Sequence, residues 1–271
     1  MNSAPGRLRN IFPAVRPLII DLLKFALLAV VLTTVMIRST EDLGYHWQWY
    51  RVPRYLLSAA EGAWMPGLLL KGLFVTLQIT AVGLVVASAF GLVTALMRLS
   101  NSILARMLAR LYLELIRNTP LLVQLFFIYF VLSPVLAISG FTSAVLALSL
   151  FEGAYASEII RAGILSIHRG QWEAAFSIGL NTWRTYRLVI LPQALRSIAP
   201  PLTGQAISLI KDSALVSTIA IYDLTMQGQT IVAETYLVFE IWFTVAAIYL
   251  VITLALSFTV AFMETRFRFD H

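Results

Sequence analysis

Long apolar runs separated by short polar segments dominate the chain. A membrane-spanning helix needs about 20 consecutive, mostly apolar residues, and six runs reach that length. They extend from about Leu18 to Ile37, Leu68 to Met97, Tyr112 to Leu136, Thr142 to Ile160, the residues after Pro200-Pro201 to Tyr222, and Leu237 to Met263. The pattern predicts an all-α membrane protein with six transmembrane helices. The first run is too long for a signal peptide and no small-residue cleavage site follows it, so we expect it to remain as a span.

The composition agrees with a membrane protein and excludes several other classes. Of the 271 residues, 59% are hydrophobic and only 13% are charged, whereas soluble domains have about 25% charged residues. So few charges could not cover a water-facing surface. The chain has no cysteine, which excludes disulfides, thiolate metal sites and cysteine nucleophiles. Its three histidines are scattered at His46, His168 and His271, so we expect neither a metal site nor a bound cofactor.

The basic residues predict which segments face the cytoplasm. They gather before the first run, between the second and third, between the fourth and fifth, and after the sixth: Arg7, Arg9, Arg16, Arg98, Arg106, Arg110, Arg161, Arg169, Arg184, Arg187, Arg196, Arg266 and Arg268. Cytoplasmic loops carry such an excess of arginine and lysine, so both termini are expected on that side. The formal net charge of +6 then reflects topology and not binding of nucleic acid. The external segment from Glu41 to Trp64 is rich in tyrosine and tryptophan, which indicates an interfacial aromatic belt or, alternatively, a docking site for an external partner.

The segment between the fourth and fifth runs has more local structure than a polar linker. It predicts a first short helix from about Gly170 to Ile178, which Gly179 ends in the left-handed conformation. Asn181 or Thr182 can cap a second helix, and Pro192 is expected to stop or kink it. We therefore expect a helical hairpin on the cytoplasmic side.

This hairpin carries a motif of characteristic spacing. Glu173-Ala174-Ala175 is followed by three residues, Gly179, nine residues and Val189-Ile190-Leu191-Pro192. The spacing resembles the EAA loop of ABC-type importer permeases, in which isoleucine is usual where Val189 stands. In that family the loop is the coupling helix that sits in a groove of the ATP-binding subunit.

Four further stretches are similar to elements of the permease subunits of polar amino-acid importers, of the histidine, glutamine, glutamate or arginine type. They are residues 72–78, 112–124, 154–164 and 210–215, and the second contains Arg117-Asn118-Thr119-Pro120-Leu121-Leu122. The resemblance covers about residues 67–265. It implies a transporter domain over 67–265 with five core helices and a coupling loop at about 164–198. Residues 1–66 would add a cytoplasmic tail, an extra first helix and the aromatic loop, and residues 266–271 a second cytoplasmic tail.

The resemblance also implies partners. They are two ATP-binding cassette ATPase subunits, a second permease subunit in a homodimer or heterodimer, an extracytoplasmic solute-binding protein and an amino-acid substrate, in the inner membrane of a bacterium. The chain has no Gly-x-x-x-x-Gly-Lys-(Ser/Thr) loop, so ATP hydrolysis is expected in a separate chain and this one is not an enzyme. The ATPase-coupling residues are expected to be Arg169, Gly170, Glu173, Ala174, Ala175 and Gly179. Glu173 either meets a basic group of the ATPase or only stabilises the start of its own helix.

Ionisable residues inside the apolar runs are costly and are therefore candidates for the substrate pathway. An amino acid needs a carboxylate for its ammonium group and a cation or helix N-terminus for its own carboxylate. The candidates are Glu152, Glu158, Lys211 and Asp212, with Thr119, Gln124 and Gln205 as polar lining. Glu152 and Glu158 are six residues apart and point to different faces of one helix. Glu158–Arg161 and Glu114–Arg117 can instead be structural ion pairs at the cytoplasmic edge.

Two other functions compete with the importer. A stand-alone secondary carrier would use Glu152 or Asp212 as a proton relay, but it has no need of the coupling hairpin. An intramembrane enzyme would show paired catalytic aspartates, a Ser–His arrangement or a His-Glu-x-x-His motif within the spans. His168 lies in the hairpin segment and the predicted spans contain no histidine, so the sequence favours a permease.

Overall fold

The computed structural model describes residues 23–31, 33–35, 38, 44–60 and 63–267. The chain divides into two compact units, Met1–Gln48 and Trp49–His271, and each is described by itself. In the first unit, residues 23–31 and 33–35 are helical and fall within the predicted first span. The rest of that span lies outside the described residues.

The second unit begins with a small folded element where the sequence predicts an aromatic loop. It contains η1 (Trp49–Arg51), α2 (Pro53–Leu56), β1 (Leu57–Ala60) and β2 (Ala63–Pro66). The two strands are antiparallel, with Leu57 opposite Pro66. A Cβ on Gly67 would lie 2.3 Å from the carbonyl oxygen of Tyr55, so glycine is required where the chain turns into the first long helix.

Three long helices carry the second unit: α3 (Leu68–Leu99), α7 (Gly140–Leu165) and α12 (Val238–Phe267). α7 is central: 67% of its 18-residue apolar stretch is buried, against 11% for that of α12. α3 and α7 approach closely, because a Cβ on Gly91 would come within 2.8 Å of the Ala156 Cβ. Small residues allow such close packing of membrane helices. The core around them includes Ile79 and Leu148, both fully buried.

The third predicted span is not one continuous helix, because the chain bends sharply within it. It consists of α4 (Ile103–Arg117), α5 (Leu121–Phe126), the π-helical η2 (Phe127–Leu132) and α6 (Ser133–Leu136). At the break between α4 and α5 the helix direction bends by 104°. Pro120 explains this elbow, because proline has no N–H to donate and disfavours helical geometry at the preceding Thr119. α4 also begins earlier than the predicted Tyr112, since the Ser102 hydroxyl caps it by accepting from the backbone N–H of Ala105 at 3.3 Å.

The region after α7 corrects the predicted role of the prolines. α8 (Arg169–Ser177), α9 (Thr182–Thr185) and the π-helical η3 (Tyr186–Ile190) lead directly into α10 (Leu191–Asp212), which η4 (Ser213–Ile219) and α11 (Leu224–Thr235) follow. Pro192 lies in the first turn of α10, so of the two predicted outcomes, a stop or a kink, the stop is wrong. The π-helical turn just before it accommodates the missing N–H. Pro200 and Pro201 lie inside α10, whereas the sequence placed them before the span.

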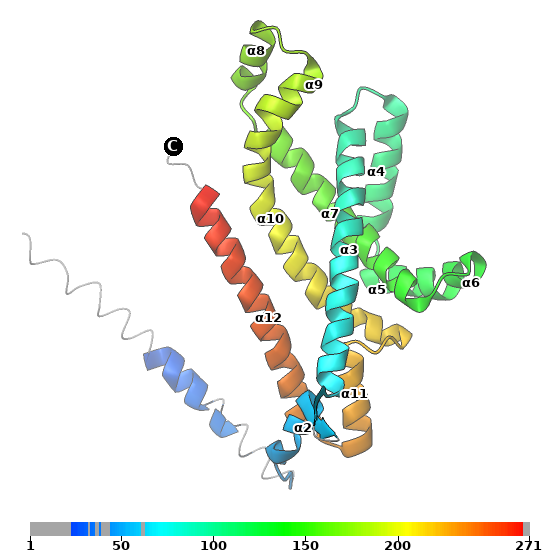
Figure 1. Ribbon diagram of the computed structural model, residues 1–271, viewed down its shortest axis with the longest axis vertical. Coiled ribbons are helices and arrows are strands. Elements are labelled where there is room, and N and C mark those ends of the chain that lie inside the picture. The colour runs from blue at the N-terminus through cyan, green and yellow to red at the C-terminus, as the bar shows by residue number, and fades with distance from the viewer. Residues whose placement is uncertain (1–22, 32, 36–37, 39–43, 61–62, 268–271) are drawn as a thin grey trace, which may run out of the picture. The chain divides into compact units, whose positions relative to one another are not determined.

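The arrangement separates two ends of the second unit. Figure 1 shows α8 and α9 at the same end as the turn between α3 and α4, and α2 and α11 at the opposite end. Three described helices are long and apolar enough to cross a membrane, or four if the bent pair is one span, against six predicted. α10 carries Arg196, Lys211 and Asp212 and is not among them. Within the described residues, the β1–β2 hairpin is the one exception to an all-helical membrane fold.

Candidate functional site

The predicted coupling segment forms a short helical projection. α8 is a helix of 9 residues from Arg169 to Ser177. This confirms the predicted helix to within one residue at each end. The backbone N–H of Gly170 donates to Nδ1 of His168 at 3.1 Å, so the His168 side chain caps the helix. Trp172 packs edge-on against Tyr186 of η3, with ring centroids 4.9 Å apart. This contact fixes α8 on the start of α10.

Gly179 and Asn181 form the turn between α8 and α9, as the sequence predicts. Gly179 has a φ of +81°, which is the left-handed region. The N–H of Leu180 donates to the carbonyl of Ala175 at 3.1 Å, which closes the end of α8. The Asn181 side chain accepts from the N–H of Arg184 at 2.9 Å and caps α9.

The neighbouring alanines of the EAA motif face different sides. Ala175 is only 3% exposed and packs inside the chain, whereas Glu173 and Ala174 are exposed. Glu173 pairs with Arg169 one turn earlier at 3.6 Å, and the two side chains are 70% and 91% exposed respectively. An exposed pair at this spacing contributes about 0.2–0.5 kcal/mol. So weak a pair leaves Glu173 available to a group on another protein.

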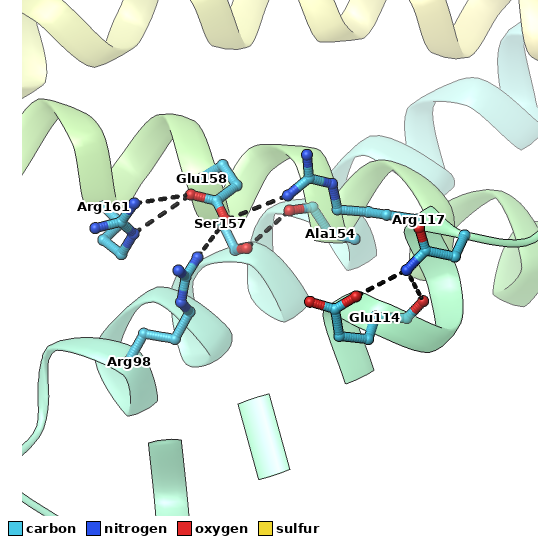
Figure 2. Close-up of polar contacts among 8 residues, drawn as sticks. Arg98, Glu114, Arg117, Ala154, Ser157, Glu158 and Arg161 are labelled. Atoms are coloured by element: carbon cyan, nitrogen blue, oxygen red, sulfur yellow. Dashed lines mark hydrogen bonds and ion pairs between the residues drawn. The ribbon is translucent and has the colours of Figure 1, made fainter. Parts of the chain in front are cut away.

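Glu158 lies at the centre of a charge cluster. Figure 2 shows Arg98 at the end of α3, Arg117 at the end of α4 and Arg161 on α7 around its carboxylate. Arg161 lies 3.2 Å from Oε2 and Arg117 lies 3.4 Å from Oε1, which Arg98 also contacts. The Glu158 side chain is 28% exposed. The cluster therefore joins three helices near the α3–α4 turn.

The two ion pairs considered from the sequence have different outcomes. Glu158–Arg161 is confirmed, with additional arginine partners. Glu114 makes no ion pair within the part of the chain that the structure describes; its Oε2 accepts from the side-chain amide of Asn118 at 2.8 Å. Arg117 instead reaches Glu158 and lies over the ring of Tyr155, 5.6 Å from its centroid.

A polar cavity of about 320 Å³ opens beside this cluster. Its lining comes from the end of α3, one face of α4 and the middle of α7. Its charged and aromatic lining residues are Arg98, Arg110, Glu114, Arg117, Tyr155 and Glu158.

Glu152 on α7 and Asp212 at the end of α10 lie close together. The sequence pattern of either helix alone could not predict this. Their carboxyl groups lie close enough to interact electrostatically. Glu152 is 3% exposed, and its Oε2 has no hydrogen-bond partner among the described residues. Lys211 supplies a neighbouring positive charge. Two carboxyl groups in contact need a shared proton or a bound cation to offset their repulsion, so this pair is a candidate cation-binding site.

The predicted polar lining residues, Thr119, Gln124 and Gln205, do not form one group with Glu152 and Asp212. The side-chain amide of Gln124 donates to the carbonyls of Ile116 at 2.7 Å and Thr119 at 3.0 Å. It thereby satisfies backbone acceptors left open at the elbow, while its own Oε1 has no partner among the described residues. Gln205 is half-buried on α10, about two turns before Asp212.

Three residues of this region were missed by sequence reasoning: Arg98, Arg110 and Tyr155. Arg98 is 60 positions from Glu158, so no local spacing could pair them. A weaker signal was present in α4, where Arg110, Glu114 and Arg117 recur at spacings of four and three. Such residues share one face of a helix, and a charged face beside an apolar one indicates a polar cavity.

The comparisons with known proteins agree with the family that the coupling-loop motif indicates. The sequence matches the family described as binding-protein-dependent transport system inner membrane component over residues 87–269. The glutamine transport system permease protein GlnP of Escherichia coli (strain K12) is 43% identical over 204 residues, which cover 74% of this chain and 93% of that protein. The L-cystine transport system permease protein TcyB of Bacillus subtilis (strain 168) is 42% identical over 197 residues, covering 72% and 84%.

A solved structure extends the likeness to three dimensions. A chain from the crystal structure of an amino acid ABC transporter with histidines matches with a TM-score of 0.69 at 41% identity, covering 73% of this chain and 94% of that chain. The second unit therefore has the fold of an ABC importer permease. Motif, sequence and fold point the same way, and the chain belongs to the family of binding-protein-dependent transport system inner membrane components.

Proposed function

We propose that this chain is the permease subunit through which an ABC importer carries polar amino acids into the cytoplasm. The family is the inner-membrane component of binding-protein-dependent transporters, so an ATPase and a solute-binding protein are its partners. The chain is not itself the ATPase, because it has no phosphate-binding loop motif. The relatives described above are named for glutamine and L-cystine transport, and these names support a polar amino acid as the substrate.

The proposed topology has six spans with both termini in the cytoplasm. α10 supplies a span, because its 22 residues extend about 33 Å at 1.5 Å per residue and match the thickness of a bilayer core. Asp212 meets Glu152 of α7, which supports the burial of this charge within protein and not in lipid. Residues 67–265 form the transporter domain, with the coupling loop at about 164–198. Residues 1–66 and 266–271 are additions at its ends.

One observation carries the proposal: the EAA segment forms a helix that projects at one end and exposes a mixed surface. Besides Glu173, the apolar Phe176 and Ile178 are 47% and 76% exposed. A short helix ended by a fixed left-handed glycine presents these groups in one orientation. We infer that this surface docks on an ATPase subunit, with Arg169 and Gly170 at the start of the contact and Glu173 at its centre.

The proposed substrate site is the acidic pair between α7 and α10. The ammonium group of an amino acid would bind Glu152 and Asp212, and Lys211 would meet its carboxylate. Glu152 offers a buried, unused acceptor for this purpose. Thr119, Gln124 and Gln205 would border the route, and Glu158 would hold the helices in place through its arginines.

A second permease subunit is part of the proposal, as a homodimer or a heterodimer. An apolar groove of about 420 Å³ lies along the elbow, and Gln124, Phe127 and Leu150 are among its lining residues. Phe127 and Phe130 are 52% and 61% exposed. A related subunit would cover this apolar surface around the buried oxygen of Gln124.

Co-purification tests the coupling assignment. The tagged chain is purified from its host in mild detergent, the bound proteins are identified by mass, and ATP hydrolysis is assayed. We expect an ATPase subunit to accompany the wild type and to be lost when Glu173 and Gly179 are both replaced. A matched double variant at exposed Leu104 and Arg106 of α4, outside the coupling loop, should keep it. Recovery of the chain alone, with uptake intact in vesicles that lack ATP, would favour a stand-alone proton-coupled carrier.

Uptake by reconstituted complexes tests the substrate site. Glu152→Gln should weaken apparent substrate affinity by at least tenfold, because a hydrogen bond to a charged group contributes about 1.5–3 kcal/mol. Glu234→Gln, at an exposed position near the end of α11, is the matched control and should behave as the wild type. An unchanged substrate dependence in the Glu152 variant would exclude this site.

A further inference from the structure

The polar cavity beside the Glu158 cluster is separate from the acidic pair that we propose as the substrate site. It has a volume of about 320 Å³, near the lower limit of the roughly 300–1,000 Å³ typical of small-molecule sites. It lies at the end of α3 and along α4, and Figure 1 places this end of the molecule with α8 and α9. In the proposed topology it therefore faces the cytoplasm.

The cationic side of the cavity has a surplus of guanidinium groups. Glu158 is surrounded by Arg98, Arg117 and Arg161, so both of its oxygens are engaged. Arg117 is the most weakly held of the three, at 3.4 Å and with 44% of its side chain exposed. Arg110 lies two turns before it on the same face of α4 and makes no ion pair within the described residues. The two arginines together can receive an anion, and planar guanidinium groups suit a carboxylate.

The acidic side of the cavity lies on the same helix face. Glu114 is between Arg110 and Arg117 in sequence and lines the cavity with them. The side-chain amide of Asn118 donates to Oε2 of Glu114, and no hydrogen bond to Oε1 is found within the described residues. Glu114 can therefore accept an ammonium group a short distance from the arginines. The ring of Tyr155, already under Arg117, forms an apolar wall beside both charges.

We propose that this cavity is a second binding site for a free α-amino acid, at the cytoplasmic exit of the pathway. Arg110 and Arg117 would bind the α-carboxylate and Glu114 the α-ammonium group. The inference rests on the proposed function, since it takes the ligand to be the transported amino acid after it has left the acidic pair. A purely structural ion cluster would balance its charges internally, whereas the lining of this cavity has three arginines, Arg98, Arg110 and Arg117, against two glutamates.

Binding stoichiometry tests the site. The complete permease–ATPase complex is placed in nanodiscs of neutral phosphatidylcholine without nucleotide, and binding of radiolabelled L-glutamine, L-cystine and L-histidine is measured. The wild type should bind two molecules of one of these amino acids per permease chain. Arg110→Gln should weaken one of the two sites at least tenfold and leave the other unchanged. Arg106→Gln, one turn earlier on α4 and outside the cavity lining, is the matched control and should keep both.

A second variant separates the two binding sites. Glu152→Gln should remove the other site and keep the one that depends on Arg110. A single site that is lost in Glu152→Gln and unchanged in Arg110→Gln would overturn this inference and leave the proposed function standing. If none of the three amino acids binds to the wild type, this inference is overturned, and the proposed function is then tested separately by ATP-driven uptake of other polar amino acids.

The α-amide of the bound amino acid lacks the carboxylate charge, and its N-acetyl derivative lacks the ammonium charge. Neither derivative should displace the amino acid from the Arg110 site. Equal displacement by inorganic phosphate would show a simple anion site and overturn the assignment.

Discussion

The left-handed turn at Gly179 makes a quantitative test of the coupling loop possible. An added Cβ at this position meets nothing within 4 Å, so alanine causes no clash. Its cost is confined to the backbone, because φ is +81° and an L-residue in the left-handed region loses about 1–2 kcal/mol relative to glycine. Asparagine tolerates this region better than alanine. The pair Gly179→Ala and Gly179→Asn therefore separates backbone conformation from side-chain size.

A penalty of about 1–2 kcal/mol corresponds to a factor of about 5–30 in an equilibrium constant. If the docked loop requires the left-handed turn and the free loop relaxes, this factor appears as weaker binding of the ATPase subunit. We expect Gly179→Ala to bind about 5–30-fold more weakly in a titration of purified ATPase against the permease in nanodiscs. Gly179→Asn should lie closer to the wild type although its side chain is larger. Uptake driven by ATP should fall in the same order, with membrane insertion intact.

Two results would refute this reasoning. Wild-type affinity in Gly179→Ala would mean that docking does not depend on the turn. Equal losses in the alanine and asparagine variants would mean that the side chain itself obstructs the contact surface, so that the effect is steric and not conformational.

Other predictions concern stability, measured as thermal unfolding followed by the fluorescence of the 6 tryptophans. Gly163→Val should destabilise by about 1–3 kcal/mol through overpacking, because a Cβ there would lie 2.2 Å from Cγ1 of Ile198; Gly204→Ala, with open space, should be near neutral. Glu158→Gln should cost about 1–3 kcal/mol, since it leaves charged partners unsatisfied. Asp223→Ala removes the cap of α11 and should cost about 0.5–2 kcal/mol. Unchanged melting curves in the Gly163, Glu158 or Asp223 variants would contradict these predictions.

Local chemistry made the coupling loop predictable from sequence. Gly179 acts through its own backbone and Asn181 through a side-chain hydrogen bond to the backbone three residues later, so their roles do not depend on the rest of the fold. The long apolar helices were predictable for a similar reason, because burial in a bilayer demands an apolar run of fixed length. α3 and α7 match their predicted spans within a few residues at each end.

The errors arose where tertiary contacts decide the outcome. Pro200 and Pro201 read as a helix boundary, but α10 continues through them while packed against α7 and α12. The sequence offered Glu158 as a pathway residue or as a partner of Arg161, and it could not predict Arg98, which reaches Glu158 from 60 positions away. The contact between Glu152 and Asp212 depends on the crossing of α7 and α10, which no single-helix periodicity contains.

The elbow at Asn118–Pro120 also determines how force passes through the molecule. A continuous helix transmits a push along its axis through its ladder of hydrogen bonds, and this ladder is interrupted at Pro120. A displacement of α4 therefore does not reach α5 as a rigid rod would carry it. Instead it passes through side chains: Arg117 of α4 contacts Glu158 on α7, and Gln124 of α5 donates across the elbow to the carbonyls of Ile116 and Thr119. The two halves of this bent span are thus coupled by side-chain contacts in place of a continuous helix, and both lie against α7.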